Sequence, residues 1–174
     1  MANGKIISID GMGGDHAPRI VVEGLERFAQ RRADLQFLLH GDEAQLKALL
    51  ANAPTAAQRT TIRHTDKMIS MDAKPADAVR RGKGSSMWNA IEAVKNGEAI
   101  AAVSAGNTGA LMGQAMMILK KAEGVERPAL AASWPTRNGV CAMLDPGADI
   151  AATAEQLVEF AIMGQAFARV VNGV

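Results

Sequence analysis

Several residue types that mark particular protein classes are rare or missing in this 174-residue chain. It has no tyrosine, only 3% aromatic residues and a single cysteine, Cys141. One cysteine excludes an internal disulfide and is typical of a reducing compartment such as the cytoplasm. No run of 18 or more apolar residues occurs, and no apolar leader follows basic residues at the N-terminus. The sequence therefore predicts neither a membrane-spanning helix nor a signal peptide.

An excess of charge of either sign is also missing. The chain has 19 basic and 18 acidic residues, a net charge of +1. Nucleic-acid-binding domains usually show a strong basic excess, so we expect no nucleic-acid partner. His40, His64 and Cys141 do not follow metal-ligand spacings, which predicts no metal site. We expect both histidines to be structural.

The residues that are present describe an alternating pattern of strands and helices. Apolar runs predict strands at 5–10, 35–40, 60–65, 99–104, 130–134 and 140–144. Helical patterns cover 19–32, 42–51, 75–79, 86–97, 110–123 and 153–171. Asp42 is expected to cap one helix, and Thr153 with Gln156 to form a capping box. In the first helix, Ile20, Leu25, Phe28 and Ala29 are expected near one face, and residues 52–59 are expected to be a loop.

This alternation predicts an α/β fold of three layers, with a mostly parallel, Rossmann-like sheet between helices. The Asn138-Gly139 pair favours a tight turn between the last two strands, which would form an antiparallel β-hairpin arm. We treat residues 1–174 as one α/β region. The sequence stops just after a helix, and we expect it to be a piece of a larger unit.

Two glycine-rich loops follow predicted strands, where α/β sheets bind ligands. The first, GMGGDHAP at 11–18, includes Gly13, Gly14, Asp15 and His16. Glycines let backbone N–H groups approach an anion, and the helix that follows adds the positive end of its dipole. The alternatives are a plain tight turn, with Asp15 as a helix cap. Asp10, Asp15 and His16 together could position a proton. His16 breaks the G-x-G-x-x-G pattern, which disfavours a nicotinamide cofactor.

The second loop, Ser104 to Gly109, contains Gly106, Asn107 and Thr108. Amide and hydroxyl groups between two glycines can bind an oxyanion or orient a carbonyl group. The alternative is a turn in which Thr108 caps the next helix.

A third segment, RRGKGSS at 80–86, places cations and hydroxyls before a helix. Arg81, Lys83, Ser85 and Ser86 are all suited to phosphate oxygens. The spacing fails the P-loop pattern, and a solvated run of charge is the alternative reading.

These segments resemble the PlsX family of phosphate acyltransferases. The likeness is carried by IDGMGGDHAPRIVVEG, by HTDKMISMDAKPADAVRRGKGSSMWNAIEAVKNGEA, and by AAVSAGNTGALMGQAMMILK. RPALAASWPT and LDPGADIAATAEQLVEFAIMG continue it. The chain departs from the family in being about half as long. It also has Asp149 where the pattern is closer to D-x-G-A-N, which argues against a ligand role there.

The resemblance implies transfer of a fatty acyl group from acyl carrier protein to inorganic phosphate, giving acyl phosphate for phospholipid synthesis. It implies the fold of the isocitrate/isopropylmalate-dehydrogenase and phosphotransacetylase group, a homodimer, and a cytosolic enzyme associated peripherally with membranes. A downstream glycerol-3-phosphate acyltransferase is a further expected partner. Neither a metal nor a nicotinamide cofactor is implied.

Within that chemistry we assign roles as hypotheses. His16, Lys83 and Asn107 are the catalytic candidates, with His16 protonating the departing thiolate. Substrate binding is assigned to Gly13, Gly14, Asp15, Arg81, Ser85, Ser86, Ser104, Gly106 and Thr108. Arg27, Arg31 and Arg32 could dock the acidic carrier protein, although a solvated helix face explains them better. The alternatives for the whole chain are a coenzyme A-dependent phosphotransacylase and a non-catalytic fragment that binds ligand or dimerises.

Overall fold

The structure is a computed structural model that describes residues 5–146 and 152–173. Its contacts divide the chain into two compact units, Met1–Lys120 and Lys121–Val174, and each is described by itself.

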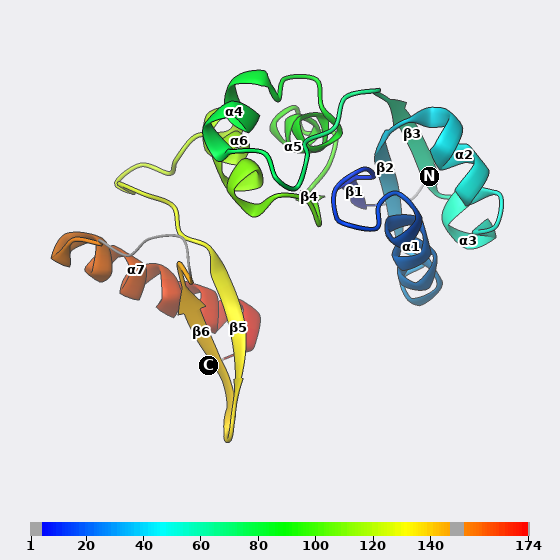
Figure 1. The fold of residues 1–174 in the computed structure, drawn as a ribbon. Coiled ribbons are helices and arrows are strands. Elements are labelled where there is room, and N and C mark those ends of the chain that lie inside the picture. The colour runs from blue at the N-terminus through cyan, green and yellow to red at the C-terminus, as the bar shows by residue number, and fades with distance from the viewer. Residues whose placement is uncertain (1–4, 147–151, 174) are drawn as a thin grey trace. The chain divides into compact units, whose positions relative to one another are not determined.

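A four-stranded parallel sheet forms the centre of the first unit (Figure 1). Its strands are β1 (Lys5–Asp10), β2 (Leu35–Gly41), β3 (Thr60–His64) and β4 (Ala101–Val103), in the order β3-β2-β1-β4. All neighbouring strands pair in parallel, with Asp10 beside His40 and Ile9 beside Val103. The carboxyl ends of β1, β2 and β4 therefore lie at one edge of the sheet.

Helices cover both faces of this sheet. They are α1 (Arg19–Arg31), α2 (Glu43–Leu50), α3 (Pro54–Ala57), α4 (Pro75–Arg81), α5 (Ser86–Lys95) and α6 (Thr108–Leu119). One face carries α1, α2 and α3, whereas α5 packs on the other against β1, β2 and β4 (Figure 1). Helices α4 and α6 pack against one another, and α6 also contacts α5.

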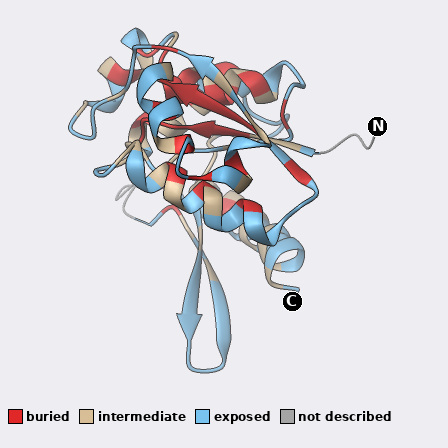
Figure 2. Ribbon diagram, turned by 90° about the vertical axis from the view of Figure 1, so that its right-hand side faces the viewer, coloured by how far each residue is buried: buried red, intermediate tan, exposed pale blue. Residues whose placement is uncertain are grey.

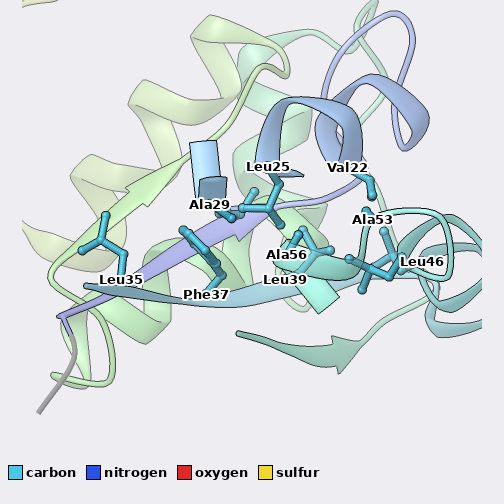
Figure 3. Close-up of a cluster of buried hydrophobic side chains, with 11 residues drawn as sticks. Val22, Leu25, Ala29, Leu35, Phe37, Leu39, Leu46, Ala53 and Ala56 are labelled. Carbon is cyan, nitrogen blue, oxygen red and sulfur yellow. The ribbon is translucent and has the colours of Figure 1, made fainter. Parts of the chain in front are cut away.

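The main core lies between β2 and α1 (Figure 3). Phe37 and Leu39 of β2 are buried against Leu25 and Ala29 of α1. These side chains recur three to four residues apart on the helix and two apart on the strand, as packing of a helix on a sheet requires. Of the four side chains that the sequence placed near one face of α1, Leu25 and Ala29 are buried, whereas Ile20 and Phe28 are more than 40% exposed. Val22 is also buried.

Local signals explain how several elements begin and end. Asp42 accepts a hydrogen bond from the Gln45 N–H at the start of α2, as predicted. Gly97 adopts φ +75° after α5, a conformation that favours glycine. Two predictions were wrong in detail. Residues 54–57, expected as loop, form the short helix α3 because Pro54 starts a turn without needing an N–H partner. Helix α6 runs from Thr108 to Leu119, whereas the sequence predicted a helix over 110–123.

The second unit contains the predicted hairpin and a helix. Strands β5 (Ala131–Thr136) and β6 (Gly139–Leu144) pair antiparallel, and most of their residues are exposed (Figure 2). Helix α7 (Ala154–Phe167) opens with the predicted capping box of Thr153 and Gln156, and continues as a π-helix, Ala168–Asn172. The predicted fold class, a mostly parallel α/β sheet between helices with a β-hairpin, is confirmed. Within residues 5–146 and 152–173, no helix is long and apolar enough to cross a membrane.

Candidate anion-binding site

The first glycine loop begins at a buried carboxylate. Asp10 ends β1 and is only 2% exposed, and its Oδ1 accepts the N–H of Met12 at 3.2 Å. The N–H of Gly11 donates to the carbonyl of His40 at 2.8 Å. Gly14 has φ +114°, which a residue with a side chain adopts only with strain. The chain is thereby turned sharply between β1 and α1.

The second glycine loop packs directly against the first. The Ser104 hydroxyl donates to Oδ2 of Asp10 at 2.7 Å and accepts the N–H of Gly106 at 3.0 Å. A Cβ placed on Gly13 would lie 2.4 Å from Oδ2 of Asp10 and 2.9 Å from the nitrogen of Gly106. Glycine is therefore required at position 13 by the close approach of the two loops.

The start of α5 lies beside these loops. Ser85 caps α5 by accepting the Trp88 N–H at 3.2 Å. The methyl group of Met87 lies 2.8 Å from the position of a Cβ on Gly106, so this helix start touches the second loop. Ser85 and Ser86 are each 1% exposed, and the Ser86 N–H donates to the carbonyl of Lys67. The segment RRGKGSS therefore ends at a helix start that touches the second glycine loop.

Asn107 has a structural role that the sequence interpretation did not foresee. Its Oδ1 accepts the N–H of Ala110 and so caps α6. Its Nδ2 donates to the carbonyls of Met71 at 2.7 Å and Ala73 at 3.0 Å. Both amide hydrogens are thereby engaged, so an oxyanion contact at this position falls to backbone N–H groups. The alternative reading in which Thr108 caps α6 was wrong, since Thr108 is the first residue of the helix and is exposed.

The other polar candidates are on the surface. Asp15, His16, Arg81 and Lys83 are all exposed. Asp15 does not cap α1, because the residue at the cap is Pro18 and no side-chain cap bond forms there. In the described part of the chain, Arg81 and Lys83 have no ion-pair partner, whereas the neighbouring Arg80 pairs with Asp77. Two cations are therefore available next to the start of α5.

His40 is buried in β2, directly beside Asp10 of β1. Its Nε2 lies 2.9 Å from the Ser8 hydroxyl, and its Nδ1 has no partner. Burial and the Arg63 charge lower the pKa of His40 to about 4, against smaller opposing effects of Asp10 and Glu98. The imidazole is therefore neutral at pH 7. The second predicted structural histidine, His64, accepts the Glu43 N–H at 3.2 Å.

Taken together, these contacts place two helix starts, α5 and α6, and a glycine-rich turn at one edge of the sheet. Each helix start carries a partial positive charge, which suits an anion, and the N–H groups of Ser86, Trp88 and Ala110 there are already bonded within the protein. Sequence reasoning named the loops but did not foresee that segment 65–74 supports them: Thr65 donates to the carbonyl of Gly84, and Asn107 binds Met71 and Ala73. No local sequence motif predicts such contacts.

Asp149 lies outside the described residues. Among the residues that the structure describes, no cluster of three or more metal-binding side chains occurs.

This is an α/β fold of the phosphotransacetylase type. A solved phosphotransacetylase from Streptococcus pyogenes superposes with a TM-score of 0.69 at 20% sequence identity, covering 98% of this chain and 55% of that one. This likeness concerns the fold alone.

Residues 6–174 match the family described as fatty acid synthesis protein, and the chain belongs to that family. A phosphate acyltransferase of Caulobacter vibrioides is 55% identical over 99% of this chain and 48% of its own length. One of Phenylobacterium zucineum is 52% identical over 100% of this chain and 50% of its own length. The chain thus spans about half the length of these relatives. The resemblance to phosphate acyltransferases predicted from the sequence is confirmed.

Proposed function

We propose that this chain supplies the phosphate-binding half of an enzyme that transfers a fatty acyl group from acyl carrier protein to inorganic phosphate. The observation that carries the proposal is the contact between the two glycine loops beside the start of α5. In that contact the Ser104 hydroxyl donates to Asp10 and accepts the N–H of Gly106. The relatives' name, phosphate acyltransferase, supports the same chemistry.

In the proposed reaction an oxygen of phosphate attacks the thioester carbonyl carbon. The new C–O bond forms as the C–S bond breaks, and the products are acyl phosphate and a thiol. Phosphate is already anionic, so no serine nucleophile is needed, and catalysis consists of positioning and oxyanion stabilisation. Lys83 and Arg81 bind the negatively charged phosphate, and N–H groups of the glycine loops donate hydrogen bonds to the oxyanion. His16 delivers the proton to the departing thiolate.

Ser85, Ser86 and Ser104 take a supporting part in this scheme. Ser104 is fully engaged in joining the two loops, and Ser85 fixes the start of α5. The binding role assigned to these serines is thus mainly to hold backbone N–H groups in place. We further propose that the complete enzyme is a homodimer that associates with membranes peripherally and passes acyl phosphate to a glycerol-3-phosphate acyltransferase.

The experiment joins this chain to the remaining half of the Caulobacter relative and supplies phosphate with either acyl-carrier-protein or acyl-coenzyme A thioester. The proposal predicts acyl phosphate from the carrier-protein donor at a higher kcat/KM. A preference for coenzyme A would support the second candidate, a coenzyme A-dependent phosphotransacylase. Acyl phosphate from neither donor would contradict both candidates and favour a ligand-binding role.

A further inference from the structure

One face of the sheet in the first unit is only partly covered. Helices α1, α2 and α3 share one core with β2 and with Ile9 of β1. Neighbouring strands lie about 4.8 Å apart and packed helices about 8–10 Å apart, so one helix covers about two strands. On this face α1 packs against β1 and β2, and within the described residues 5–120 of the first unit no helix lies over β4.

A groove of about 410 Å³ marks that position. Its exposed lining is almost wholly apolar and comes from α1, β1, β2 and β4, including Ile20, Gly24, Phe28 and Val103, and it reaches Ser104 and Ala105 of the second glycine loop. Ile20 is 47% exposed, Phe28 43% and Val103 53%. Strands of a parallel sheet are normally covered on both faces, so apolar side chains exposed in this way indicate a missing layer.

We propose that a helix with an apolar face, from the other half of the family fold, packs into this groove. The curated relatives are about twice as long as this chain, and the solved phosphotransacetylase also extends well beyond the part that this chain covers. A second helix on this face, beside α1, would bury Ile20, Phe28 and Val103 together. The inference rests on family membership and on the bare face of β4, and it does not depend on the proposed reaction.

The test uses Gly24, which lines the groove from α1, is exposed, and has no atom within 4 Å of its Cβ position. Gly24→Cys is made in a Cys141→Ser background, in this chain alone and in this chain joined to the remaining half of the Caulobacter relative. A maleimide should label Gly24→Cys readily in the chain alone and at least ~10-fold more slowly in the joined protein. The matched control is Ala48→Cys on the exposed side of α2, which should label equally in both.

Equal labelling of Gly24→Cys in the two proteins would overturn the proposal. So would protection that arises only when a fatty acid is added, because the groove would then hold an acyl chain. Gly24→Leu gives an independent measurement. It should raise the melting temperature of the chain alone by a few degrees, roughly the effect of replacing glycine within a helix, and lower that of the joined protein by overfilling the groove. A rise in both proteins would contradict the proposal.

Discussion

At the scale of single residues, the site depends on how closely two backbone segments approach. Asp10 is a buried carboxylate whose oxygens accept the Met12 N–H and the Ser104 hydroxyl. The Ser104 hydroxyl in turn accepts the Gly106 N–H. This chain of hydrogen bonds fixes the second loop relative to the first. It also places Gly13 where a single added methyl group would collide with both partners.

Gly13→Ala is therefore expected to separate the loops. In the protein joined to the Caulobacter half, the variant should lose at least ~10-fold in kcat/KM for phosphate, because the oxyanion-binding N–H groups move. Gly24→Ala is the matched control: its Cβ would meet no atom of the described chain within 4 Å, so it should keep activity. Unchanged kinetics in Gly13→Ala would show that the contact between the loops does not matter for phosphate.

His40 gives a prediction about pH. Its pKa falls from the ordinary 6.5 to about 4 in the folded state, chiefly by burial. The unfolded chain therefore binds the proton more readily, so the contribution of His40 to stability is complete above pH 6.5 and is lost as the pH falls towards 4. The expected loss is at most about 3 kcal/mol.

Urea unfolding of the wild type and of His40→Asn, from pH 7 to pH 4, measures this effect. The wild type should lose stability more steeply than the variant across that range. Parallel pH profiles would mean that His40 titrates normally in the folded protein.

At the scale of elements, the caps at the helix starts differ in how far they can be predicted from the sequence. The capping signals at Asp42 and at Thr153 with Gln156 could be predicted from the sequence, since these caps act over three residues. Asn107 shows where this reasoning ends. It caps α6 as a local signal allows, but its bonds to Met71 and Ala73 join segments more than 30 residues apart, and tertiary packing alone determines them.

The caps of α5 and α2 form a matched pair for mutation. Ser85→Ala and Asp42→Ala each remove a side chain that accepts an N–H of the first turn, so each should cost roughly 1 kcal/mol of unfolding free energy. Met87 of α5 touches Gly106 of the second glycine loop, whereas the start of α2 lies against Met12 of the first loop. Ser85→Ala should therefore also raise the KM for phosphate in the joined protein, whereas Asp42→Ala should not. Equal phosphate KM values in the two variants would remove the start of α5 from the site.

At the scale of the whole molecule, alternation of strands and helices was enough to predict the parallel sheet, and Asn138-Gly139 was enough to predict the hairpin. The burial of α1 was less predictable. Helical periodicity placed Ile20 and Phe28 near the same face as Leu25 and Ala29, yet both line the groove beside β4 and are exposed. Periodicity identifies apolar side chains but does not say which of two neighbouring layers will bury them, and one of those layers lies beyond this chain in our proposal.

The central claim is that these loops and the start of α5 hold inorganic phosphate for acyl transfer. Lys83, an exposed cation without an ion-pair partner in the described structure, tests it most directly. Steady-state kinetics of the joined protein with varied phosphate would compare Lys83→Ala with Lys95→Ala, an exposed lysine at the far end of α5. The account predicts a roughly tenfold higher KM for phosphate in Lys83→Ala alone, since a lost contact worth about 1.4 kcal/mol weakens binding tenfold. An unchanged phosphate KM in Lys83→Ala would contradict it.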